Sequence, residues 1–268
     1  MKLSKRLETI LEALEPCPIM LDVGCDHGYT AIEAVQRKKA EQAIAADVAE
    51  GPLRAAAAHI QAAGLSSRIQ KLQSDGLRAF LQEANKKIQT KEAALVISGV
   101  GGKLLCDILA GKPTNGLRDE KPAETKEAAA TLLRGMHQLL LSPQSEPERL
   151  RHLLIDELKF AIEREIMCLD EGKYYVILDV RPQKKAEDYA EEAFYTYGKM
   201  LCMNPDAVFL SYLRARREKT AKAKEQAEKA AAKAKDNSGS AGRQAEALQE
   251  KLRQIDYALR IAERNLPK

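Results

Sequence analysis

Short apolar segments alternate with amphipathic ones over the first 180 residues, and this alternation constrains the fold most. The apolar segments are IMLDV (19–23), AIAAD (43–47), IQKLQ (69–73), ALVIS (94–98) and LLLS (139–142). The amphipathic segments with helical spacing lie at 27–38, 49–63, 76–88, 102–110 and 146–158. Buried strands that alternate with helices form right-handed βαβ units, so this order predicts a doubly wound, mostly parallel sheet.

Two further apolar segments complete the sheet. AIEREIMCL (161–169) and YYVILDV (174–180) flank Asp170-Glu171-Gly172-Lys173, which is typical of a tight hairpin. The hairpin adds an antiparallel strand, and the predicted fold class is a Rossmann-like, seven-stranded α/β sheet. The segment 111–137 is long for a connection in such a fold, so we expect a loop and an extra helix there.

The chain changes character beyond Pro182, and we expect one domain at 1–183 and a helical one at 184–268. A short connecting helix is predicted within 194–205, and a break at 236–242 separates two heptad-spaced runs. These runs are Phe209, Leu213, Arg216, Thr220, Ala223, Ala227, Ala230, Ala234 and Leu248, Leu252, Ile255, Leu259, Ala262. The spacing predicts an antiparallel, coiled-coil-like helical hairpin. Residues 205–268 carry a net charge of +6 and the remainder −2. This asymmetry fits a polyanionic partner, but charge alone favours a solvated helical face.

The stretch LDVGCDHGY (21–29) places a turn after the first strand with the form D-x-G-x-D-x-G. A dinucleotide-binding turn needs G-x-G-x-x-G, but Asp26 and Tyr29 occupy the two later glycine positions counted from Gly24. No G-K-[ST] follows, so a P-loop is excluded as well. A carboxylate would repel a pyrophosphate, whereas it suits the amine and sulfonium of S-adenosylmethionine.

Polar residues or glycines follow each of the next three strands. Asp47 lies about 25 residues after Asp22, where an acid accepts hydrogen bonds from ribose hydroxyls, and Asp75 is placed to take the adenine amino group. Each acid could instead cap a helix. The glycine loop, residues 98–102, brings bare backbone to the same edge. The predicted cofactor-binding residues are Asp22, Gly24, Cys25, Gly28, Asp47, Val48, Asp75, Gly76, Ser98, Gly99, Val100 and Gly101, for S-adenosylmethionine and its product S-adenosylhomocysteine.

Several stretches together resemble the TrmK-type tRNA (adenine(22)-N(1))-methyltransferases of bacteria. They are KLSKRLETI, LDVGCDHGY, AIAADVAEGPL, SDGL, VISGVGG, LSPQSEPERLRHLL and EGKYYVILDV. The resemblance implies a class I methyltransferase with a C-terminal helical extension that methylates adenine N1 in tRNA, at position 22. General amino-group methyltransferases carry an N-P-P-Y-like motif after the fourth strand, where this chain has Ser98-Gly99-Val100-Gly101-Gly102.

The resemblance gives candidate roles to residues beside the cofactor. Asp26 would hydrogen-bond the target adenine or stabilise its developing charge, although it could also cap a helix; His27 would support Asp26 or contact phosphate. Tyr29 would stack on the base, or pack on the sheet edge. Pro143 and Gln144 are expected near the acceptor base. The predicted RNA-binding residues are Arg214, Arg216, Arg217, Lys219 and Lys222.

The remaining sequence features bear on environment and partners. The five cysteines are scattered without metal spacing, so no metal is predicted. No segment is long and apolar enough to span a bilayer, and the N-terminus lacks a secretory signal, so we expect a cytoplasmic protein that does not bind a membrane. The resemblance implies tRNA as its partner, and we expect a monomer. The alternatives are a methyltransferase acting on another RNA site or a small molecule, and a non-catalytic RNA-binding protein of the same fold.

Overall fold

The computed structural model describes residues 3–82, 92–114, 122–234 and 239–266. The chain divides into two compact units, Met1–Asp188 and Tyr189–Lys268. The sequence-based boundary, between residues 183 and 184, lies five residues earlier, near the end of the last strand.

The first unit is built on one seven-stranded sheet with the order β3-β2-β1-β4-β5-β7-β6. Its strands are β1 (Cys17–Val23), β2 (Ala40–Asp47), β3 (Ile69–Gln73), β4 (Ala94–Ser98), β5 (Gln138–Ser142), β6 (Phe160–Asp170) and β7 (Lys173–Lys185). The first five strands pair in parallel, and β7 is antiparallel to both β5 and β6. The predicted Rossmann-like sheet with a terminal hairpin is confirmed.

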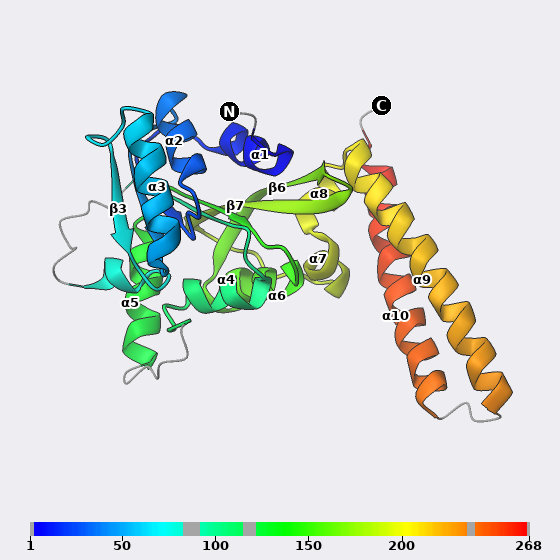
Figure 1. The fold of residues 1–268 in the computed structure, drawn as a ribbon. Helices are drawn as coiled ribbons and strands as arrows, with labels where there is room; N and C mark the ends of the chain where they lie inside the picture. Colours follow the sequence, from blue (N-terminus) through cyan, green and yellow to red (C-terminus); the bar gives the residue numbers. More distant parts are fainter. Residues whose placement is uncertain (1–2, 83–91, 115–121, 235–238, 267–268) are drawn as a thin grey trace. The chain divides into compact units, whose positions relative to one another are not determined.

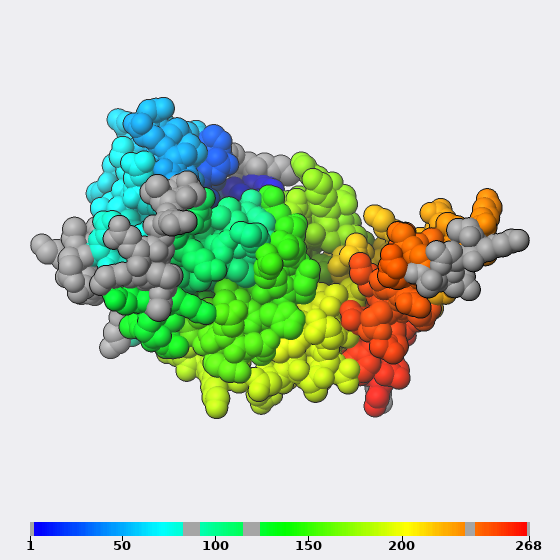
Figure 2. All heavy atoms as spheres, turned by 90° about the horizontal axis from the view of Figure 1, so that it is seen from below, coloured from blue at the N-terminus to red at the C-terminus, as the bar shows by residue number. Residues whose placement is uncertain are grey.

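Helices cover both faces of this sheet, as right-handed crossovers on either side of β1 require (Figure 1). Three successive helices pack side by side, namely α1 (Lys5–Ala13), α2 (Tyr29–Gln36) and α3 (Glu50–Ala62). The others are α4 (Gly102–Leu109), α5 (Pro122–Arg134) and α6 (Pro147–His152), of which α4 and α6 are in contact. Figure 2 shows α4 (teal) and α6 (green) adjoining on the surface of the unit.

The parallel register brings the carboxyl ends of the five parallel strands to one edge. Val23 pairs with Ala46 and Ile97, and Ser98 pairs with Ser142. Asp47 pairs with Gln73 on the far side. The residues that follow these strands therefore meet along one line, which is where ligands bind in doubly wound sheets.

Three predicted helices differ from the observed elements. The segment 76–88 holds only the 3₁₀ turn η1 (Arg78–Leu81) in its described part, and residues 83–88 lie outside the described residues. The Ser74 hydroxyl donates to the Gly76 carbonyl at 2.6 Å and accepts from the Ala79 amide at 3.1 Å. It therefore binds backbone C=O and N–H groups that would otherwise be available for the hydrogen bonds of an α-helix. The predicted 146–158 helix changes after α6 into the π-helical turn η3 (Leu153–Glu157), and the predicted 27–38 helix begins only at Tyr29.

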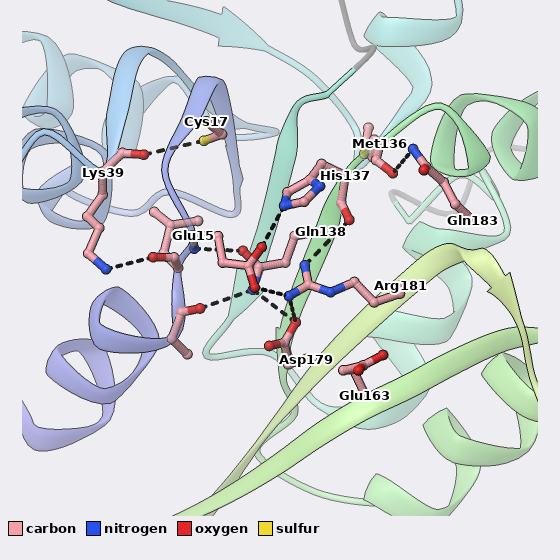
Figure 3. A network of polar contacts seen from close by, with 12 residues as sticks. Glu15, Cys17, Lys39, Met136, His137, Gln138, Glu163, Asp179, Arg181 and Gln183 are labelled. Carbon is pink, nitrogen blue, oxygen red and sulfur yellow. Dashed lines mark hydrogen bonds and ion pairs between the residues drawn. The ribbon is translucent and has the colours of Figure 1, made fainter.

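A polar network ties α1 and β1 to the hairpin strands at the opposite, amino edge of the sheet (Figure 3). Gln138 donates to the fully buried Asp179 at 2.9 Å and to the Ala13 carbonyl at 3.0 Å. Glu15 binds both His137, at 2.7 Å, and Arg181. Burial alone would raise the pKa of Glu15, but these two partners outweigh it and the net pKa is lowered. Since these charges are paired, the network has a structural role.

The second unit contains α7 (Glu192–Tyr197), α8 (Lys199–Met203) and two long helices, α9 (Ala207–Ala234) and α10 (Ser240–Arg264), which form the predicted antiparallel hairpin (Figure 1). The heptad assignment on α9 is wrong at two positions, because Arg216 and Ala230 are exposed while Ala231 is buried. Part of the predicted break, 235–238, lies outside the described residues. Within the described ranges, no helix has the length and apolar character needed to cross a bilayer.

Candidate cofactor and acceptor site

The turn between β1 and α2 folds back tightly on the end of β2. Gly24 and Cys25 both donate their backbone N–H groups to the Ala46 carbonyl, at 2.9 and 3.0 Å. Gly28 has φ +73°, and a Cβ atom there would lie 3.0 Å from the Cβ of Ala56 on α3. Both the left-handed conformation and this contact require glycine, so residue 28 fixes how closely the turn packs on α3.

Asp22, near the end of β1, is the strongest electrostatic feature of the turn. Its side chain is 3% exposed, and its Oδ2 atom has no hydrogen-bond partner among the described residues. Burial raises the pKa of Asp22 from 3.8 to about 7, against a hydrogen bond from the Ala31 backbone, and the charge of Asp47 adds to the rise. An unpartnered buried carboxylate oxygen is costly unless a ligand supplies the missing donor.

The ends of β2 and β3 carry the other two predicted acids. Asp47 is half-buried and accepts a hydrogen bond from the Ala49 amide at 2.9 Å, in the turn just before α3. The N-cap of α3 is Ala49, without a side-chain capping bond, so Asp47 is not the cap residue of this helix. The bond from Ala49 goes to Asp47 Oδ1, so Oδ2 is the oxygen placed to accept from a ligand. Val48, next in the chain, is 46% exposed, which leaves an apolar surface beside the acid.

Asp75 is engaged by a residue that the sequence did not single out. Its two carboxylate oxygens accept from the Thr114 amide at 3.1 and 3.0 Å, and Oδ1 also accepts from the Thr114 hydroxyl. Gly76, which follows, is buried against Ile108. The start of the 111–137 segment therefore contacts the carboxylate predicted to bind adenine; residues 115–121 lie outside the described residues.

The glycine loop after β4 packs directly on the loop that follows β5. Gly102 donates to the Ser145 carbonyl at 2.9 Å, and the Val100 carbonyl accepts from the Gln144 amide at 2.8 Å. A Cβ atom at position 102 would lie 2.5 Å from the carbonyl oxygens of Ser145 and Glu146, so only glycine allows this approach. Ser98, Gly99, Val100 and Gly101 are partly exposed at the same edge. Pro143 is buried, whereas the Gln144 side chain is exposed.

Asp26 and His27 project from the turn with side chains that are 75% and 48% exposed, and Asp26 Oδ1 lies 3.5 Å from His27 Nε2. Tyr29 is half-buried and its ring stacks on His59 at 4.8 Å between centroids. His59 Nδ1 lies 3.0 Å from the His27 carbonyl, and His59 Nε2 lies 3.4 Å from the Tyr29 hydroxyl. Donation from Nδ1 to the carbonyl leaves Nε2 to accept from the hydroxyl. His59 is therefore a positioning residue that the sequence did not reveal.

The predicted RNA-binding residues of α9 are all exposed, but three of them form ion pairs. Arg217 contacts Asp256 at 2.6 Å, Arg214 contacts Glu263 at 3.3 Å, and Lys222 contacts Glu218 at 2.6 Å. Arg216 lies over the Tyr212 ring at 5.9 Å, and Lys219 is exposed. Exposed ion pairs contribute only about 0–1 kcal/mol, so an RNA phosphate can compete with them.

The sheet order and the acids and glycines at its carboxyl edge define a Rossmann-like, S-adenosylmethionine-dependent methyltransferase. The profile of the TrmK family, described as tRNA (adenine(22)-N(1))-methyltransferase, matches residues 20–256. The chain belongs to this family.

Individual relatives agree with this assignment. The Bacillus subtilis (strain 168) tRNA (adenine(22)-N(1))-methyltransferase is 32% identical over 213 residues, which are 78% of this chain and 79% of that protein. The crystal structure of the B. subtilis m1A22 tRNA methyltransferase TrmK matches with a TM-score of 0.72 at 26% identity, covering 96% and 99% of the two chains. Streptococcus pneumoniae Sp1610 in complex with S-adenosyl-L-methionine matches with a TM-score of 0.73 at 28% identity, covering 96% and 100%.

Proposed function

We propose that this protein transfers a methyl group from S-adenosylmethionine to N1 of adenine 22 in tRNA. The observation that carries the proposal is the unpartnered Oδ2 of Asp22, buried beside a glycine turn at the edge where Asp47 and Asp75 also lie. A buried acid with one oxygen that has no donor among the described residues fits a cationic cofactor, and its position at the central strands fits the crevice of a doubly wound sheet.

The residues of the site divide the work of binding. Asp22 and the turn 24–28 hold the amino-acid part of the cofactor, Asp47 receives the ribose hydroxyls, and Val48 covers the adenine. Asp75 accepts the adenine amino group once it is released from Thr114. The glycine loop 98–101 brings bare backbone close to the reacting atoms.

The bound cofactor supplies an activated methyl group on a sulfonium. This chain's main contribution to the rate is to hold adenine N1 in line with that group, because alignment replaces a costly loss of motional freedom. Asp26, exposed at the mouth of the turn, stabilises the positive charge that develops on the ring. N1 lies on the Watson–Crick edge, so the base must be unpaired or extruded to reach Asp26.

The direct test is to incubate the purified protein with labelled S-adenosylmethionine and unmodified tRNA, and to locate the methyl group by nucleoside mass spectrometry and by mapping. We expect 1-methyladenosine at position 22, and none in tRNA carrying guanosine there. Methylation at another site would support the alternative RNA substrate. Binding of the cofactor without methylation of a competent tRNA would support the non-catalytic alternative.

The role of the helical hairpin is tested by removing charge without breaking an ion pair. Arg216→Gln with Lys219→Gln should weaken tRNA binding, reduce its salt dependence by about two charges, and leave cofactor affinity unchanged. The matched control is Arg260→Gln with Lys251→Gln on α10, because Arg260 lies over Tyr257 at 5.3 Å as Arg216 lies over Tyr212. Equal effects of both pairs would contradict a specific role for this part of α9.

The proposed location is the cytoplasm, where tRNA is modified, and the proposed form is a monomer. The monomer is supported by the fact that one chain supplies all of the acids and glycines of the proposed site. Light scattering at the concentrations used for the methylation assay checks the oligomeric state. A dimer that persists at these concentrations would contradict the proposed monomer.

A further inference from the structure

Arg6 of α1 lies beside the glycine loop, although the two are far apart in sequence. A Cβ atom at position 99 would lie 3.6 Å from Arg6 Nη2, 3.7 Å from Arg6 Nη1 and 4.0 Å from Gln144 Nε2. The guanidinium is also 5.0 Å from the centroid of the Tyr175 ring, which it covers. Donors from α1 and from the loop after β5 therefore face one point above bare backbone.

The guanidinium has capacity left for a ligand. Arg6 Nη1 is buried and has no hydrogen-bond partner among the described residues. Asp170 accepts from the Arg6 backbone N–H at 3.1 Å, and among the described residues no ion pair within 4 Å joins their side chains. Arg6 as a whole is half-buried, so part of its side chain reaches the surface.

We propose that Arg6 binds a phosphate oxygen of the target nucleotide and so positions the acceptor base. This rests on the proposed methyl transfer to tRNA. Arg6 lies on the β4–β5 side of the edge, with Gly99, Gln144 and Tyr175, whereas the acids for the cofactor lie at or just after the ends of β1, β2 and β3. Because Arg6 lies on the side of the sheet edge away from the cofactor acids, we assign it to the acceptor nucleotide rather than to the cofactor.

Charge selects a phosphate over the base itself. Methylation of N1 puts positive charge on the adenine ring, and a guanidinium against that ring would oppose the reaction. A phosphate oxygen is anionic throughout, and the planar fork of arginine pairs with it through two hydrogen bonds. Arg6 would thus hold the backbone of the extruded nucleotide while Asp26 faces its base.

The test compares Arg6→Gln, Arg6→Lys and a matched control, Lys5→Gln. Lys5 is the exposed neighbour on α1, so its substitution removes the same charge without touching the glycine loop. We expect Arg6→Gln to lower kcat/KM for tRNA by roughly 10- to 100-fold, the range for losing a hydrogen bond to a charged group. Arg6→Lys should recover part of this loss, and Lys5→Gln should stay within about twofold of the wild type, the small effect expected of an exposed charge.

Two further readouts separate phosphate binding from other roles. The salt dependence of tRNA binding should fall by about one charge in Arg6→Gln. Calorimetry without RNA should give an unchanged cofactor affinity, and thermal unfolding should stay within a few degrees. A drop in cofactor affinity as large as the drop in kcat/KM would overturn the proposal and assign Arg6 to the cofactor carboxylate.

Methylation by the wild-type protein separates a failure of the proposed function from a failure of the role given to Arg6. If the wild type forms no methyladenosine, the proposed function has failed. If the wild type is active and Arg6→Gln matches it, only the role of Arg6 is refuted. A loss of activity with an unchanged salt dependence would also refute the phosphate contact.

Discussion

Replacing Asp22 by asparagine should stabilise the cofactor-free protein and weaken cofactor binding at the same time. The carboxyl is 3% exposed, its Oδ2 is unpartnered, and burial raises its pKa from 3.8 to about 7. The folded protein therefore holds the Asp22 proton more tightly than the unfolded chain does. As pH rises from about 4 to about 7, the unfolded chain releases this proton first, so the free energy of unfolding falls.

The size of the effect follows from the two pKa values. The interval from 3.8 to about 7 corresponds to roughly 4 kcal/mol of lost stability above pH 7, an upper bound because structural relaxation and water reduce it. Asparagine has nearly the same shape and carries no charge. The variant should thus be more stable than the wild type by about 2–4 kcal/mol at pH 8, and close to it at pH 4.

Denaturant unfolding of both proteins without cofactor, at several pH values from 4 to 8, measures this difference. Calorimetry at pH 8 should show at least about tenfold weaker S-adenosylmethionine binding by the variant, because a charge-assisted contact is lost. Wild-type binding should release a proton near pH 7, visible as a buffer-dependent heat. The reasoning is refuted if the variant is less stable than the wild type at pH 8, or if both have the same pH dependence.

Three other substitutions, two of them with a matched control variant, test contacts of the first unit. Gly28→Ala should lose about 1–3 kcal/mol of stability and weaken cofactor binding, because its Cβ atom would press on Ala56. The control is Gly64→Ala, where φ is +70° and no atom lies within 4 Å of the added Cβ, so only the backbone strain should appear. Equal losses of stability in denaturant unfolding would contradict a role for the Ala56 contact. Glu165→Gln should cost about 3 kcal/mol because it removes the negative charge from the buried ion pair with Arg151, which is 2.6 Å away and 1% exposed. Glu163→Gln, at an exposed pair with Lys184, should cost under about 0.5 kcal/mol, and a similar value for both would contradict the burial argument. Thr114→Val should tighten S-adenosylmethionine binding by roughly fivefold in calorimetry, because it removes the hydroxyl that competes for Asp75. Weaker binding would show instead that the contact between Thr114 and Asp75 helps to form the site.

The fold was predictable because its signals are local. Buried parallel strands need continuous apolar residues, so the runs ending at Val23, Asp47 and Ser98 mark both the sheet and its ligand edge. The error at 76–88 arose because a side chain, Ser74, competes with the helix for backbone groups. On α9, alanines at 230 and 231 are equal in size, so composition did not distinguish which one faces α10.

The missed site residues share a different cause. Arg6, His59 and Thr114 reach the site from segments distant in sequence, and no motif spacing connects them with Gly99, Tyr29 or Asp75. From the sequence, an arginine on an amphipathic N-terminal helix is expected to be solvent-exposed, whereas the structure shows Arg6 lying over the Tyr175 ring. Motifs thus predicted the residues fixed by strand ends, whereas the residues that complete the site required tertiary structure.

The carboxyl edge of the sheet has acids on one side and Arg6 on the other, an arrangement that the sequence motifs alone did not suggest. Acids lie at or just after the ends of β1, β2 and β3, whereas Arg6, whose Nη1 has no partner among the described residues, lies with the Gln144 amide beside the glycine loop after β4. Methyl transfer carries positive charge from the cofactor to the adenine ring, so acids are useful at both ends of that path and a cation is not. A cation is useful only where the substrate stays anionic, at its phosphates. The placement of Arg6 beyond the acids therefore fits a nucleotide that enters with its backbone on the β4–β5 side and its base directed toward Asp26.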